Sequence, residues 1–203
     1  MERAKGGDAK SQSFIGYWYE TGKKGLSKDY DKAVQWYRRA ASQGDSFSNY
    51  RIGRMYHYGY GLAQNYQRAV RYYDPAARAG NANAQVALGS LYFEGRGVDK
   101  DYTKAWIWFK KSANQKNAWA QNYLGHMCHN GYGVERDREE ALRWFAKSAA
   151  QGYAPAEVNM GLICERKRKY QDALMWYKRA ETKDNELARA GIKRIRRILY
   201  KRK

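Results

Sequence analysis

The sequence predicts an all-α fold built from about five helix-pair repeats, and three observations support this prediction. Apolar residues lie three and four positions apart within each unit, which is the periodicity of an amphipathic helix. A glycine recurs every 36 residues, after a first step of 37, at Gly16, Gly53, Gly89, Gly125 and Gly161. An alanine that precedes an aromatic pair by three positions recurs in a parallel series, at Ala33, Ala69, Ala105, Ala141 and Ala173. Five aligned copies indicate an α-solenoid, in which stacked units share a continuous core.

Composition excludes several other classes of protein. The 203 residues include 39 Lys and Arg against 20 Asp and Glu, which gives a formal charge of +19. The 43% hydrophobic and 15% aromatic content argues against intrinsic disorder. Two cysteines and two prolines argue against a disulfide scaffold and a proline-rich linker. No apolar stretch is long enough to form a transmembrane segment. The excess of positive charge predicts an anionic partner.

Each unit is predicted to contain two helices joined by a glycine loop, because glycine supplies the positive φ that ends a helix. These loops lie at 59–62, 95–98 and 131–134. The second helix is predicted to begin at an N-cap residue, namely Asp29, Asn65, Asp101 and Asp137. A glycine inside the first helix costs about 1 kcal/mol relative to alanine. Its recurrence therefore predicts close packing against an aromatic ring of the neighbouring helix.

Two units depart from the pattern. The second unit has Pro75 inside its second helix, where proline removes a backbone hydrogen bond and predicts a kink. The fifth unit is four residues shorter, and residues 165–168 replace its glycine loop. The first aromatics of the pairs are predicted to pack between repeats, at Trp36, Trp108, Trp144 and Trp176.

Both ends of the chain carry information. Residues 2–8 resemble the end of a second helix, so we expect that the natural precursor carried more N-terminal sequence, such as a signal peptide. This expectation favours the periplasm or cell envelope, with the cytoplasm as the alternative. At the other end, residues 186–203 predict a basic helix that caps the array with its polar outer face. Its apolar stripe is Ala188, Ile192, Ile195 and Leu199.

The repeated motif resembles the Sel-like repeat family, a branch of the tetratricopeptide superfamily. The matching pattern is A-x-A-x-x-x-L-G-x-x-Y-x-x-G-x-G-V-x-x-D-x-x-K-A-x-x-W-F-x-K-A-A-x-Q-G, and it covers roughly residues 9–185. The resemblance implies a right-handed α-solenoid of antiparallel helix pairs that forms a single domain over residues 1–203. Its repeats are expected at about 9–45, 46–81, 82–117, 118–153 and 154–185, followed by the cap helix at 186–203.

The resemblance also implies where a partner binds. In the superfamily, offsets of −6, −3, +1, +4 and +5 from the repeat glycine face a concave groove. These offsets also place Glu94 in the groove. The predicted partner-binding residues at these offsets are Tyr17, Phe47, Tyr50, Arg54, His57, Tyr58, Phe93, Trp119, Asn122, His126 and His129. Tyr, Trp and Arg dominate binding hot spots. The alternative for Phe47, Tyr50 and Trp119 is burial against adjacent helices.

The sequence contains no motif of an enzyme active site, so we expect a protein without catalytic activity, cofactor or metal. His126 and His129 share a helix face, but no carboxylate or cysteine completes a metal site. Cys128 and Cys164 occupy the same position in consecutive repeats, about 8–10 Å apart by helix stacking. A disulfide requires Cα atoms within about 7 Å, so both are predicted to be small core residues.

Two functional hypotheses follow. By resemblance, we expect a bacterial protein-binding scaffold that holds a protein partner, acidic because the chain is basic, in its aromatic groove. Family roles include envelope assembly factors, secretion-system adaptors and immunity proteins. A small basic array suits the last of these roles, as an inhibitor of a secreted effector such as a lipase. The alternative is electrostatic binding of a polyanion, either nucleic acid or an acidic exopolysaccharide, with affinity that falls steeply as salt rises.

Overall fold

The computed structural model describes residue 4 and residues 6–200, whose secondary structure comprises eleven α-helices and no strand. This confirms the predicted all-α fold. The chain divides into two compact units, Met1–Ser112 and Ala113–Lys203. Organisation as a single domain stays a prediction.

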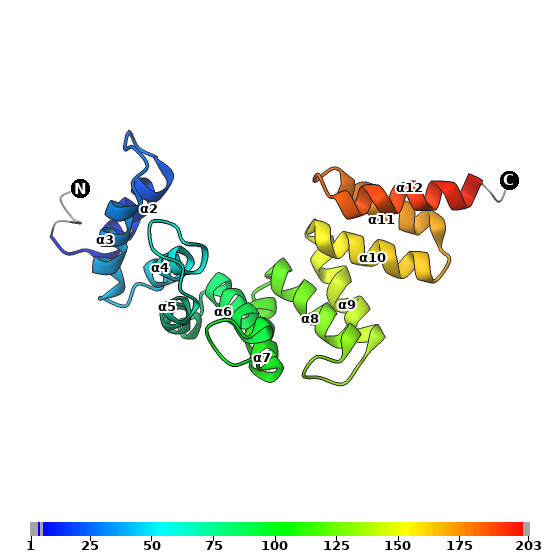
Figure 1. Ribbon diagram of the computed structural model, residues 1–203, viewed down its shortest axis with the longest axis horizontal. Coiled ribbons are helices and arrows are strands. Elements are labelled where there is room, and N and C mark those ends of the chain that lie inside the picture. The colour runs from blue at the N-terminus through cyan, green and yellow to red at the C-terminus, as the bar shows by residue number, and fades with distance from the viewer. Residues whose placement is uncertain (1–3, 5, 201–203) are drawn as a thin grey trace. The chain divides into compact units, whose positions relative to one another are not determined.

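The first unit contains three helix pairs in sequence order (Figure 1). Large side chains such as Tyr37, Ile52, Met55, Tyr73 and Leu88 are fully buried in its core. Its helices are α2 (Ala9–Thr21), α3 (Tyr30–Ala41), α4 (Ser46–Tyr58), α5 (Tyr66–Arg78), α6 (Ala82–Glu94) and α7 (Tyr102–Asn114), whose last turn crosses the unit boundary. Helix α5 is continuous across Pro75.

The second unit contains two helix pairs and a terminal helix that packs on the last pair (Figure 1). Cys128 is buried, as predicted, whereas Cys164 is half-buried, and no disulfide joins the two. The helices of this unit are α8 (Ala118–Asn130), α9 (Arg138–Ala150), α10 (Ala154–Arg166), α11 (Tyr170–Glu181) and α12 (Glu186–Tyr200).

The predicted helix ends are confirmed in the first four repeats. Asp29 accepts a hydrogen bond from the backbone N–H of Lys32 at 2.9 Å, as an N-cap does. Asn65, Asp101 and Asp137 cap their helices in the same way. Left-handed glycines end the first helices, at Gly22, Gly59, Gly95 and Gly131. The fifth repeat has neither the N-cap hydrogen bond nor the C-terminal glycine, since α10 and α11 have no side-chain cap and their C-cap residues are Lys167 and Thr182.

The recurring helix-interior glycine lies against the second aromatic of each pair, as predicted. A Cβ built at Gly53 would lie 2.5 Å from the Tyr73 ring, and one at Gly89 would lie 2.9 Å from Phe109. The same contact recurs at the other three repeat glycines, with the rings of Tyr37, Phe145 and Tyr177 at 2.7, 2.6 and 2.5 Å. No side chain fits at these distances, so any residue larger than glycine would force the helices apart.

The first aromatics of the pairs are covered partly by cations. Trp144 is buried and its three counterparts are half-buried. A Lys or Arg three residues later lies over each indole, 4.3 Å from the ring centroid for Lys147 and Trp144. The equivalent pairs are Arg39 over Trp36, Lys111 over Trp108 and Arg179 over Trp176. Part of the basic composition therefore packs on the repeats instead of facing a partner.

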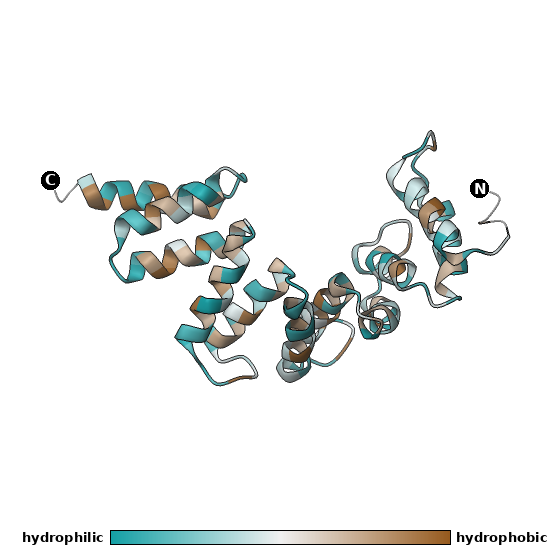
Figure 2. Cartoon of the chain, turned by 180° about the vertical axis from the view of Figure 1, so that it is seen from behind, coloured by the Kyte–Doolittle hydropathy of each residue, from teal (hydrophilic) through white to brown (hydrophobic). Residues whose placement is uncertain are grey.

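Helix α12 caps the last repeat, as predicted. Ala188, Ile192 and Ile195 are buried in a cluster with Val158 and Tyr177. Figure 2 shows hydrophilic and hydrophobic residues alternating along this helix, as an amphipathic cap requires. Lys193, Arg196 and Arg197 are exposed on its outer side. Residues 201–203 of the predicted cap lie outside the described residues.

The substitution Gly53→Ala tests the glycine–aromatic contact. Alanine in a helix normally stabilises it by about 1 kcal/mol relative to glycine. Here we expect destabilisation by about 1–3 kcal/mol, because the new methyl group would overlap the Tyr73 ring. Chemical unfolding followed by circular dichroism measures the change. Gln67→Ala, at an exposed position of α5, is the control and should change stability little; increased stability of Gly53→Ala would contradict the packing constraint.

Candidate functional site

Seven residues of the first unit form a surface that we call the aromatic face: Tyr17, Phe47, Tyr50, Arg51, Arg54, His57 and Tyr58. Tyr17 and Phe47 meet edge to face with ring centroids 6.3 Å apart. The Arg51 guanidinium carbon lies 5.4 Å from the Tyr17 centroid and 5.7 Å from that of Phe47. Phe47 is 37% exposed, whereas the Arg51 side chain is 12% exposed and pairs with Glu20, so the aromatic part of this cluster is what solvent reaches at the start of α4.

The other end of the aromatic face lies in the last turn of α4. Tyr58 is 46% exposed, stacks on His57 at 4.4 Å and lies below the Arg54 guanidinium at 5.8 Å. Tyr60 of the glycine loop continues the stack at 5.5 Å. Tyr50 is half-buried, and burial raises its pKa. Phe47 is thus exposed and Tyr50 is partly buried, and partner binding by either residue stays a prediction. Phe93, also predicted, packs on Tyr102 at 5.1 Å.

The predicted residues of the second unit are partly engaged in packing. Trp119 is 45% exposed, with its ring 6.2 Å from that of Tyr123. Asn122 is buried and accepts a hydrogen bond from Asn159 at 2.9 Å. The same Asn159 amide lies 3.2 Å from Nε2 of His126. Asn122 and His126 thus contribute to contacts between α8 and α10. The joining of the two units' residues in one concave groove stays a prediction.

The surroundings of the three histidines favour the neutral imidazole. Burial is the main cause that lowers the pKa of His57, of His126 and of His129, and nearby cations lower it further for His57 and His129. Among the residues that the structure describes, no three His, Cys, Asp or Glu side chains gather to hold a metal ion. In the same residues, no helix is long and apolar enough to cross a membrane.

A carboxylate clamp of related design occurs once in each unit. In the first, Glu20 accepts hydrogen bonds from the Tyr37 hydroxyl and from Nε of Arg51, both at 2.7 Å. Each clamp links the two helices of a repeat to the next helix, and charged partners make its hydrogen bonds strong. The first clamp also fixes the position of Arg51 within the aromatic face.

In the second unit, Glu165 accepts a hydrogen bond from the Tyr177 hydroxyl at 2.7 Å. Nε of Arg194 donates to the same carboxylate at 2.5 Å. Arg194 is the main cause that lowers the pKa of Glu165, while burial is the main cause that raises the pKa of Tyr177.

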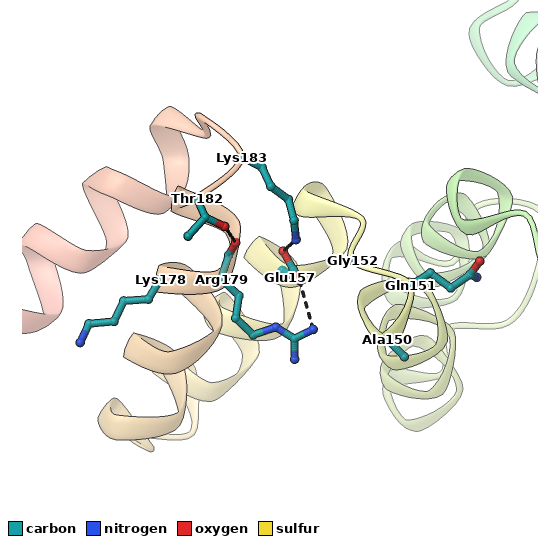
Figure 3. A pocket seen from close by; sticks show the side chains of 8 residues that line it. All are labelled: Ala150, Gln151, Gly152, Glu157, Lys178, Arg179, Thr182 and Lys183. Atoms are coloured by element: carbon teal, nitrogen blue, oxygen red, sulfur yellow. Dashed lines mark hydrogen bonds and ion pairs between the residues drawn. The ribbon is translucent and has the colours of Figure 1, made fainter.

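A buried carboxylate replaces a buried amide in the fifth repeat. The amide groups of Gln12, Gln85 and Gln121 each donate to the carbonyl eight residues earlier. Glu157 occupies this position in α10, is fully buried and pairs with Lys183 and Arg179 at 2.5 and 3.3 Å (Figure 3). Arg179 also donates to the carbonyl oxygen of Ala149, which is the atom that a glutamine would have reached.

Comparison with known proteins decides the family. The model of the Sel1 repeat matches residues 9–45, 46–81, 82–117, 120–153 and 155–185. The chain belongs to the Sel1-repeat family. Proteins built from this repeat are generally non-catalytic scaffolds typical of protein–protein interaction. A comparison with curated proteins finds no match.

Solved structures support the same assignment. A protective antigen of uropathogenic Escherichia coli with this repeat fold is 34% identical over 94% of the chain, with a TM-score of 0.86. The Sel1-repeat chain spans 42% of that antigen's length. A Sel1 repeat protein from Oxalobacter formigenes is 31% identical over 89% of the chain and 73% of its own, with a TM-score of 0.84. An immunity protein of Pseudomonas aeruginosa shares the fold at 19% identity, over 85% of the chain and 64% of its own, with a TM-score of 0.58.

Sequence reasoning missed the charged residues that organise these surfaces. Arg51 lies outside the chosen repeat offsets, and Glu20 was not selected although it has the same offset as His57 and His129. One signal was available: Glu20 and Glu165 stand at the same offset in the first and last repeats, and both repeats have tyrosine as the second aromatic. Glu157 stands out in the same way, because the equivalent positions hold Gln or Asn.

Arg194→Gln tests the clamp of the second unit. We expect the pKa of Glu165 to rise, because its main stabilising partner is removed. The pKa of Glu165 in the folded protein lies below its ordinary value of 4.5. The clamp therefore stabilises the protein fully above pH 4.5, and this stabilisation is lost as the pH falls through the folded-state pKa. The variant should therefore lose less stability on acidification. Carbon-13 NMR titration of the Glu165 carboxyl measures the shift; the exposed Arg196→Gln is the control, and an unchanged pKa in Arg194→Gln would refute the assignment.

Proposed function

We propose that this Sel1-repeat protein is a non-enzymatic scaffold that binds an acidic segment of a partner protein on its aromatic face. The observation that carries the proposal is the exposure of Phe47 and Tyr58 beside the guanidiniums of Arg51 and Arg54. Tyrosine and arginine are enriched in binding hot spots, and exposed aromatic side chains in a cluster are typical of interaction surfaces.

Charge supports the choice of an acidic partner. The acid that contacts this face, Glu20, is already bound by Arg51 and Tyr37. Arg54 forms no ion pair with a described residue, and Lys23 and Lys28 add positive charge from the loop after α2. A partner's carboxylates would therefore meet unsatisfied cations, while its apolar groups cover Phe47. A net charge of +19 also speeds the encounter with such a partner.

A finer proposal is that the protein is an immunity protein. Two structures with a similar fold are immunity proteins of Pseudomonas aeruginosa, each at 19% identity, a level at which the likeness concerns the fold alone. Under this proposal, the partner is an acidic secreted effector, such as a lipase, and the two proteins meet in the periplasm or cell envelope.

Binding of a polyanion is the second candidate, and the second unit favours it. Residues 166–169 are four consecutive exposed cations, and three of them belong to residues 165–168, which replace the glycine loop. Arg196 and Arg197 are exposed on α12. Nucleic acid or an acidic polysaccharide would neutralise such charges and release counterions.

The double substitution Phe47→Ala with Tyr58→Ala tests the scaffold proposal. We expect binding of a protein partner, retrieved by nuclease-treated pull-down and measured by calorimetry, to weaken about tenfold or more, as removal of hot-spot aromatics does. Ile107→Ala removes a comparably exposed apolar side chain from α7 of the same unit and should leave affinity unchanged. Equal affinity of the double variant and the wild type would exclude the aromatic face.

Substitution of Arg168, Lys169, Arg196 and Arg197 by glutamine tests the second candidate. If a polyanion is the ligand, retention on single-stranded DNA or an acidic polysaccharide should fall. The slope of log affinity against log salt should then decrease by about 0.7 for each phosphate that the variant no longer neutralises. The scaffold proposal expects these changes to leave the protein partner's affinity within about twofold, since exposed charges outside an interface contribute little.

A further inference from the structure

A cavity of about 420 Å³ in the second unit lies between the end of α8, the first turns of α9 and the end of α10. Its apolar part is formed by Leu142 and Ile163, both half-buried. Its polar lining consists of His129, Arg138, Arg166 and Lys167, with one acid, Glu139. The cavity is therefore amphipathic, with an aliphatic surface beside several cations.

Within residue 4 and residues 6–200, the cations of this cavity form no ion pair with an acid. Among the described residues, neither Arg138 nor Lys167 forms an ion pair, and Glu139 forms none with either. The Arg166 guanidinium contacts the imidazole of His129 at 3.3 Å. Most of the guanidinium donors around the cavity are thus available to an anion.

The contact between Arg166 and His129 fixes the form of the imidazole. A guanidinium can only donate, so Nε2 of His129 must be the unprotonated acceptor and the ring is neutral. Arg136 donates from Nε to the backbone carbonyl of His129 at 3.0 Å, which adds a further cation behind the ring. The site consequently holds positive charge that an arriving carboxylate would offset.

We propose that this cavity binds an acidic side chain flanked by an aliphatic one, presented by the protein partner. The carboxylate would accept hydrogen bonds from Arg138 and Arg166, and the aliphatic group would cover Leu142 and Ile163. A polyanion of phosphates would use the cations but not the aliphatic surface. The inference rests on the proposed scaffold function and adds a contact point in the second unit that differs from the aromatic face.

Three capped dipeptides test this proposal directly on the full chain. Acetyl-Leu-Glu-amide carries both groups, acetyl-Leu-Gln-amide lacks the charge, and acetyl-Ala-Glu-amide lacks the aliphatic side chain. Each is titrated while NMR follows the His129 imidazole and the Arg138 and Arg166 Nε–H signals. We expect saturable shifts with acetyl-Leu-Glu-amide and binding about tenfold weaker for either analogue, because charge-assisted hydrogen bonds and apolar burial both contribute.

Two variants complete the test. Arg166→Gln is expected to abolish the saturable shifts of acetyl-Leu-Glu-amide, whereas Arg143→Gln should preserve them. Arg143→Gln also removes one arginine charge, from α9. The Arg143 side chain is exposed, pairs with Glu140 and does not line the cavity. Circular dichroism is used to check that Arg166→Gln remains folded.

Equal binding of the alanine analogue, or persistence of binding in Arg166→Gln, would overturn the inference. If no dipeptide binds but a protein partner binds with an affinity that depends on Phe47 and Tyr58, the proposed role of the cavity is refuted and the proposed function stands. Dipeptide binding without any protein partner would support the cavity and count against the proposed function.

Discussion

The contact between a helix glycine and an aromatic ring is the constraint on which the rest of the structure depends. The two helices of each repeat approach so closely that a Cβ at Gly125 would lie 2.6 Å from Phe145. The close contact fixes how the second helix of each repeat packs on the first helix. It thereby also fixes which side chains of the first helix face outward. In the first repeat, the Tyr37 ring that lies against Gly16 is also 6.3 Å from the Phe47 ring, and its hydroxyl donates to Glu20, so the same contact bears on the aromatic face and on the clamp.

Repetition made the fold predictable and left much of the site unpredicted. Glycine, aromatic and cap positions each occur in several copies, so their physical roles could be derived from spacing alone, and Asp29 and Gly53 behave as expected. Residues that occur once carry no such signal. The ion pairs of Glu157 and the cations around His129 depend on which side chains meet in three dimensions. Asn122 was placed by offset, but its burial against Asn159 depends on the following repeat.

Polar groups in the core are satisfied by a small set of interchangeable arrangements. Gln43 donates to Gln12 at 3.0 Å, and Gln151 donates to Gln121 at 2.8 Å, each joining the second helix of a repeat to its first. In the fifth repeat, Lys183 and Glu157 make the equivalent contact as an ion pair. A fully buried carboxylate is costly unless its partners remain, so this repeat depends on its cations in a way that the neutral ones do not.

The same difference bears on how such an array can grow during evolution. Gln85 and Gln121 reach the preceding repeat through identical atoms and an identical separation along the chain. A duplicated copy inserted at either junction would find its hydrogen-bond acceptor already in place. The fifth repeat offers no such junction, because Arg179 occupies that acceptor and α12 covers the far side. An added repeat at either of these two junctions would therefore keep the glutamine hydrogen bond, whereas one placed before the fifth repeat would have to accommodate the ion pairs of Glu157.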